Sequence, residues 1–133
     1  MMIKILAVAF GGALGALFRF GIGEGVARWA PGVSLPWATF TANSLGCLLI
    51  GLLWPIVTER YGASSAIGAL IFVGFLGALT TFSTYAFEGL ELARADAQWL
   101  RAGLWVVGQN VVGFLAVGIG WMAGAWWIGN PSG

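Results

Sequence analysis

The stretch Gly74–Tyr85, which reads G-F-L-G-A-L-T-T-F-S-T-Y, concentrates the side chains that could interact with an ion. It lies in an uncharged run, 63–87, and carries two glycines followed by four hydroxyls, at Thr80, Thr81, Ser83 and Thr84. In a membrane helix such hydroxyls can bond to the carbonyl four residues earlier, and glycines allow close helix packing. The same residues are also typical of a helix that breaks inside the membrane, where freed carbonyls can hold a cation and freed amides an anion. From these residues alone, both interpretations stay open.

The composition predicts an integral membrane protein. Of the 133 residues, 59% are hydrophobic and 8% are charged, whereas a soluble domain carries about 25% charged residues. The chain has no histidine, which removes the commonest general base and metal ligand. Its single cysteine, Cys47, cannot form an intrachain disulfide, and a net charge of +1 gives no indication of a nucleic-acid partner. With no paired nucleophile and base and no pair of carboxylates inside a span, we predict that the chain is not an enzyme.

Four apolar segments are predicted to cross the membrane as helices within a single domain, 1–133. They cover about 3–23, 37–57, 64–93 and 101–128. An unbroken third helix would measure about 45 Å against a hydrocarbon core of about 30 Å, which favours a break near Gly77. Positive charge leans only slightly towards placing the termini outside, so the chain could insert in either orientation.

Polar residues elsewhere in the spans are mostly neutral. Asn43 is costly in hydrocarbon unless it is bonded, so it either joins helices or lines a path. Neutral donors suit an anion better than a fixed carboxylate would, and the positive edges of the Phe82 and Tyr85 rings can assist them. Phe82 taken alone is better explained by core packing, and Arg19 taken alone by snorkelling to the interface. Gln109 and Asn110 are the polar residues of the fourth span. These residues indicate either transport or an assembly role.

Three segments resemble the Fluc (CrcB) family of bacterial fluoride channels, and the resemblance covers nearly the whole chain. G-G-A-L-G-A-L-F-R-F at Gly11–Phe20 is similar to the family's G-G-x-x-G-A-x-x-R-[FY]. W-A-T-F-T-A-N-S-L-G at Trp37–Gly46 is similar to its W-G-T-x-x-x-N-x-x-G. The stretch Gly74–Tyr85 is similar to its G-F-x-G-x-x-T-T-F-S-T-[FY], which is the most specific of the three motifs.

The resemblance implies a dual-topology homodimer of antiparallel subunits, surrounded by lipid in the bacterial inner membrane. It implies a fluoride-selective channel that exports fluoride passively and so lowers cytoplasmic fluoride. Backbone carbonyls of Gly77 and Thr80 from both subunits would hold a structural sodium ion at the dimer centre. Arg19 would lie at a vestibule. The ion path would contain Asn43, Phe82, Ser83, Thr84, Tyr85 and Glu88.

The sequence departs from the family pattern at several positions. Tyr85 stands where many members have phenylalanine, so a phenolic hydroxyl enters the path, and Ala38 replaces a more usual glycine. The fourth span lacks hydroxyls that some members direct at the pore; the residues concerned here are Leu104, Gly108 and Val112. The far end of the path is therefore expected to be built differently, and no site residue is assigned in the fourth span.

Two other functions remain open on sequence grounds. One is a small dual-topology exporter that trades protons for organic cations. Such a protein would be expected to carry a carboxylate deep in the first span, where this chain has only Glu24 at the end. The other is a structural membrane subunit with no transport of its own.

Overall fold

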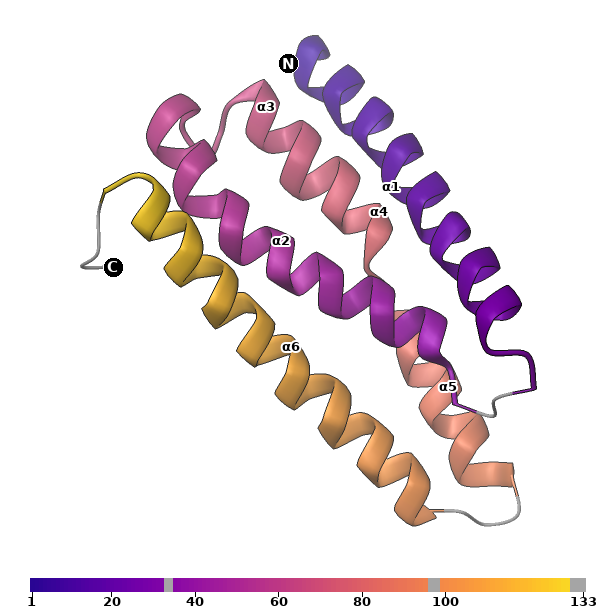
Figure 1. The fold of residues 1–133 in the computed structure, drawn as a ribbon. Helices are drawn as coiled ribbons and strands as arrows, with labels where there is room; N and C mark the ends of the chain where they lie inside the picture. The colour runs from indigo at the N-terminus through magenta and orange to yellow at the C-terminus, as the bar shows by residue number, and fades with distance from the viewer. Residues whose placement is uncertain (33–34, 96–98, 130–133) are drawn as a thin grey trace.

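The computed structural model describes residues 1–32, 35–95 and 99–129, and these form helices joined by short connections (Figure 1). Three helices are continuous: α1 (Met2–Trp29), α2 (Trp37–Tyr61) and α6 (Trp99–Trp127). The third span is assembled from α3 (Ala66–Gly68), η1 (Ala69–Leu76), α4 (Gly77–Leu79) and α5 (Phe82–Arg94). Each of the four spans is long and apolar enough to cross a membrane, and the described residues contain no strand. This confirms the prediction of an all-helical protein with four membrane spans.

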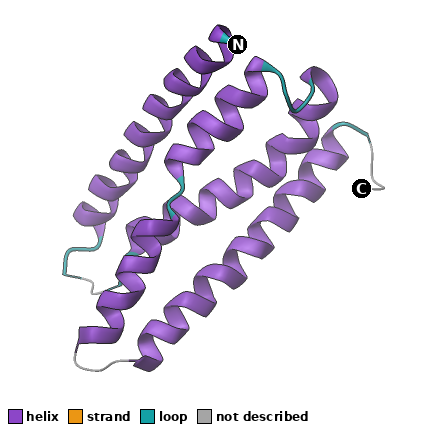
Figure 2. Cartoon of the chain, turned by 180° about the vertical axis from the view of Figure 1, so that it is seen from behind, coloured by secondary structure: helices purple, strands orange, loops and turns teal. Residues whose placement is uncertain are grey.

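The two halves of the third span pack on different neighbours. The first half, η1 and α4, lies against α1, whereas α5 lies against α6. α2 packs along α6 and also touches both halves. Figures 1 and 2 show the same division from opposite sides, with the third span changing direction where α4 meets α5. The described parts of the chain therefore form two helix groups that meet at this point, with α2 running beside both.

Glycines allow the closest of these approaches. A Cβ atom at Gly15 in α1 would overlap the carbonyl oxygen of Phe75, and one at Gly120 in α6 would overlap that of Leu48 in α2. Such contacts between backbones are typical of membrane helices, where association depends on packing rather than on the exclusion of water. Gly11 and Gly15 therefore bring the backbone of α1 directly onto that of η1.

The third span is interrupted at Thr80 and Thr81, near its middle. Both residues have extended backbone, with φ −87° and ψ 155° at Thr80 and φ −149° and ψ 120° at Thr81. Gly77 remains helical, with φ −63° and ψ −32°. The predicted break is confirmed, but it lies three residues beyond Gly77. The segment before it, η1, is a π-helical stretch, in which the turns are wider than in an α-helix.

The buried core of a single chain is small. Ala42, Leu76 and Leu79 form its centre, and partly buried apolar residues of α1, α2 and η1 surround them. Large apolar side chains remain exposed along every span; Phe82 and Phe114, for example, are 80% and 79% exposed. In a membrane protein such surfaces face lipid or another protein chain.

Candidate ion-binding cavity

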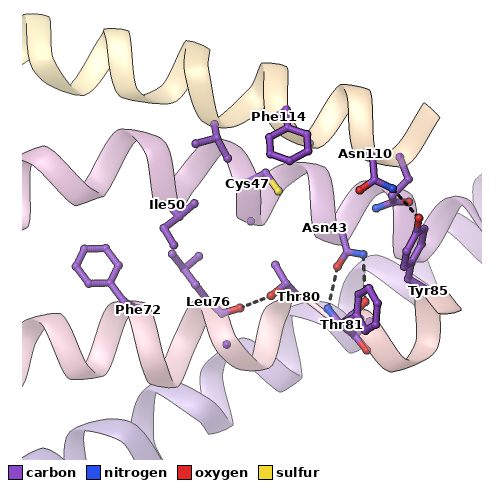
Figure 3. A pocket seen from close by; sticks show the side chains of 16 residues that line it. Asn43, Cys47, Ile50, Phe72, Leu76, Thr80, Thr81, Tyr85, Asn110 and Phe114 are labelled. Carbon is purple, nitrogen blue, oxygen red and sulfur yellow. Dashed lines mark hydrogen bonds between the residues drawn. The ribbon is translucent and has the colours of Figure 1, made fainter. Parts of the chain in front are cut away.

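A cavity of about 440 Å³ lies beside the break, between α6 and the first half of the third span (Figure 3). It occupies the region where α6 makes no contact with η1 or α4, and α2 forms its floor. Its polar lining comes from Asn43, Thr80, Thr81, Tyr85, Gln109 and Asn110. Ile50, Phe72, Leu76, Phe82, Phe114 and Val117 supply apolar walls. None of the described residues that line the cavity is charged.

The Asn43 side chain holds the break in place from the neighbouring helix. The N–H of Thr81 donates to Asn43 Oδ1 at 2.8 Å, and Asn43 Nδ2 donates to the carbonyl oxygen of Thr81 at 3.2 Å (Figure 3). Both backbone groups of Thr81 are thus satisfied without a helix, which removes most of the cost of leaving them unpaired. Asn43 has a second N–H on Nδ2, which makes no hydrogen bond to any described residue, and its side chain lines the cavity.

The hydroxyls around the break serve two structural purposes. Thr80 Oγ1 donates to the carbonyl oxygen of Leu76 at 2.9 Å, a back-bond to the carbonyl four residues earlier at the end of α4. Thr81 Oγ1 instead accepts from the N–H of Thr84 at 3.2 Å and so caps α5. Back-bonding is therefore present at Thr80 and a helix break at Thr80 and Thr81, whereas ion binding at the break stays a prediction.

Ser83 and Thr84 lie at the start of α5 and are exposed. Ser83 Oγ lies 3.3 Å from Thr81 Oγ1, and Thr84 Oγ1 accepts from Thr81 Oγ1 at 3.0 Å. Neither is among the residues that line the cavity of a single chain. Their assignment to an ion path stays a prediction.

Phe82 and Tyr85 form a ring pair at the start of α5, with centroids 5.8 Å apart and planes tilted by 52°. Tyr85 is buried and Phe82 is exposed. The Tyr85 hydroxyl accepts from Asn110 Nδ2 at 2.7 Å and donates to the carbonyl oxygen of Val106 at 3.3 Å. The phenolic oxygen that the sequence adds to this position is therefore bonded to α6.

Glu88 and Arg19 lie outside the cavity. Glu88 is half-buried on α5, where its Oε1 accepts from Thr39 Oγ1 at 2.7 Å and its Oε2 is buried without a partner among the described residues. Arg19 is half-buried on α1 and has no ion-pair partner in the described parts of the chain. A path role for Glu88 and a vestibule role for Arg19 stay predictions.

Sequence reasoning left α6 without site residues, yet Gln109 and Asn110 both line the cavity. Gln109 is 7% exposed, and its buried Oε1 has no hydrogen-bond partner among the described residues. Gln109, Gly113 and Val117 recur every four residues and face the same space. That spacing, together with an amide in an apolar span, is the signal that could have identified this face. Thr81 was likewise noted in the sequence but not assigned.

The donors in the lining suit a small anion, whereas Gln109 Oε1, which has no partner among the described residues, is an acceptor. The second Asn43 N–H and the N–H of Phe82, which is the first amide of α5, are donors on residues that line the cavity. The positive end of the α5 dipole adds to them. The rings of Phe82 and Tyr85 also line the cavity, and the edge of an aromatic ring carries positive potential without a hydrogen-bonding proton.

Comparison with known proteins identifies similar chains. Residues 6–121 match the family model described as "CrcB-like protein, Camphor Resistance (CrcB)". A protein of Salinibacter ruber named "Fluoride-specific ion channel FluC" is 44% identical over 131 residues, which cover 98% of this chain and 96% of the relative. Proteins with the same name from Chloroflexus aurantiacus and Nitrosococcus oceani are 41% and 39% identical, over 96% and 88% of this chain and 100% and 92% of the relatives.

Proposed function

The chain belongs to the CrcB-like protein family, and from this premise we propose that it is a fluoride-specific ion channel in the bacterial inner membrane. The observation that carries the proposal is an uncharged cavity beside a helix break, with amide donors and aromatic rings in its wall. Relatives of nearly the same length bear that name, so the family-level function applies to the whole membrane domain rather than to a shared fragment.

Conduction of fluoride requires partial replacement of a strongly held hydration shell. Neutral N–H groups and ring edges can do this without binding the ion so tightly that it fails to leave. A carboxylate in the same wall would repel the anion, and the cavity has none among its described residues. Flow would be passive, down the fluoride gradient, and export would lower the cytoplasmic concentration.

A second, antiparallel copy is part of the proposal. The cavity is bounded by a single chain on only some of its sides, and Phe82 and Phe114 at its rim are largely exposed. The small difference in positive charge between the two ends favours insertion in both orientations. An antiparallel partner would bring a second break next to the first.

A structural sodium ion at that junction is also proposed, held by the carbonyl oxygens of Gly77 and Thr80. In a continuous helix these oxygens would accept from the amides of Thr81 and Thr84. The Thr81 amide is bonded to Asn43 and the Thr84 amide to the Thr81 hydroxyl, so both carbonyls are released from the helical pattern. Neutral carbonyl dipoles suit a hard monovalent cation. When bound, the ion would supply positive charge beside the anion path.

The test is fluoride efflux from liposomes that contain the purified protein, followed with a fluoride electrode. We expect efflux that starts only when a potassium ionophore removes the opposing potential, and that is far slower when chloride replaces fluoride. Liposomes without protein provide the control. Efflux equal to that control, or equal rates for both halides, would refute the proposal.

A further inference from the structure

The Tyr85 hydroxyl adds a hydrogen-bond donor at this position, which the side chain of phenylalanine would not supply. A free hydroxyl at the cavity wall would bind a small anion far more strongly than a ring edge does. The position of its proton therefore matters for ion flow. In the structure this proton is not free, since Tyr85 donates to the carbonyl oxygen of Val106.

Asn110 supplies the second contact to the same hydroxyl. Its Nδ2 lies 2.7 Å from Tyr85 Oη (Figure 3) and 2.7 Å from the Val106 carbonyl oxygen. A carbonyl can only accept, so the amide group that faces Val106 must be the NH₂ and not the oxygen. Both N–H bonds of Asn110 are thereby used, one for each oxygen.

This arrangement excludes a direct role for Asn110 as an anion donor. With both N–H bonds engaged, the amide can present only its oxygen to the cavity that it lines. An amide oxygen repels an anion. Any favourable effect of Asn110 on fluoride must therefore act through Tyr85.

We propose that Asn110 is a positioning residue: it holds the Tyr85 hydroxyl on α6, so that the cavity meets the edge of the Tyr85 ring and no phenolic donor. The inference rests on the proposed channel function and concerns this chain's own departure from phenylalanine at residue 85. The Tyr85 ring is restrained further because it packs against the Phe82 ring, with centroids 5.8 Å apart. Val106, whose carbonyl oxygen accepts the hydrogen bond from the Tyr85 hydroxyl, is not among the residues that line the cavity.

The first test is a double-mutant cycle on fluoride efflux, with Asn110→Leu, Tyr85→Phe and the double variant. In the tyrosine background we expect Asn110→Leu to slow efflux about fivefold, the value of one neutral hydrogen bond. In the Tyr85→Phe background the same substitution should change efflux by less than about twofold, because no hydroxyl remains to be held. The matched control is Val107→Leu, on an exposed α6 position outside the cavity. An equal loss in both backgrounds, or a loss no larger than that of the control, overturns the proposal.

The second test does not depend on ion flow. The chain has two tyrosines, so Tyr61→Phe at the exposed end of α2 leaves Tyr85 as the only tyrosine. The chemical shift of its ring carbon next to the hydroxyl, measured with ¹³C-labelled tyrosine in liposomes, reports the hydrogen bonds of that oxygen. We expect Asn110→Leu to move and broaden this resonance, and Val107→Leu to leave it in place. An unmoved resonance refutes the positioning role even if the protein conducts fluoride, whereas a moved resonance in a protein without flux refutes only the channel function.

Discussion

Replacement of Asn43 by aspartate tests most directly whether Asn43 holds the helix break and also faces the ion, because the two side chains have nearly the same shape. The new carboxylate can still accept from the Thr81 N–H, as Asn43 Oδ1 does at 2.8 Å. Its other oxygen, however, replaces the Nδ2 donor and faces the Thr81 carbonyl oxygen, which Asn43 contacts at 3.2 Å. One hydrogen bond is lost, and a negative charge appears in the wall of the cavity.

The two consequences differ in size. Loss of one hydrogen bond with an unpaired carbonyl costs about 1–3 kcal/mol of folding free energy. A fixed negative charge about 4 Å from a passing anion costs about 4 kcal/mol at an effective dielectric constant of about 20, which lowers occupancy about a thousandfold. The effect on flux should therefore far exceed the effect on stability.

Liposome efflux and thermal unfolding in detergent measure the two effects separately. We expect Asn43→Asp to abolish measurable fluoride efflux while the protein still unfolds cooperatively at a moderately reduced temperature. Asn43→Leu serves as the comparison, since it loses both contacts with Thr81 without adding charge and should be the less stable of the two variants. Normal efflux by Asn43→Asp would show that Asn43 does not face the ion, and the proposed path would have to be abandoned.

Three further predictions follow from other parts of the structure. Phe82→Ile keeps apolar volume but removes the ring edge, so fluoride efflux should fall at least tenfold. The control, Phe87→Ile, lies at an exposed α5 position away from the cavity and should leave efflux within twofold of the wild type. Equal effects of the two substitutions would contradict the role of the ring. Gly15→Ala places a methyl group on the Phe75 carbonyl and should cost about 1–3 kcal/mol of stability, while Gly21→Ala, which has open space around it, should be neutral in the same thermal assay. Sodium bound at the carbonyls of the break should raise the unfolding temperature with increasing concentration, and identical curves in sodium and potassium salts would argue against that site.

Local sequence features were sufficient to predict the spans and the existence of the break. Apolar length and glycine spacing define the four spans, and an overlong third segment with four hydroxyls indicates an interruption. The position of the interruption was less accessible, because it depends on Asn43, which lies 38 residues away from Thr81 in the sequence. Glycine at 77 permits a break but does not cause one; the amide that pairs with the Thr81 backbone does.

The lining of the cavity was also only partly predictable, because it too depends on contacts between residues that lie far apart in the sequence. The sequence marks Gln109, Asn110 and Tyr85 as polar groups in apolar spans, but not which of them meet. Their meeting depends on the register of α5 against α6, which is set by the packing of α5 on α6 and of α6 on α2. A family pattern centred on hydroxyls in the fourth span drew attention to Leu104, Gly108 and Val112, whereas the cavity uses the neighbouring face at Gln109, Gly113 and Val117.

The division of the third span between two neighbours has a mechanical consequence. Because η1 and α4 are fastened to α1 while α5 is fastened to α6, any sliding of one pair past the other is transmitted to the two extended residues that connect them. Lipid thickness or lateral tension, which acts on the outer surfaces of α1 and α6, would thus be felt at Thr80 and Thr81 without any direct contact. The helix break beside the proposed route is in this way coupled to the state of the surrounding bilayer.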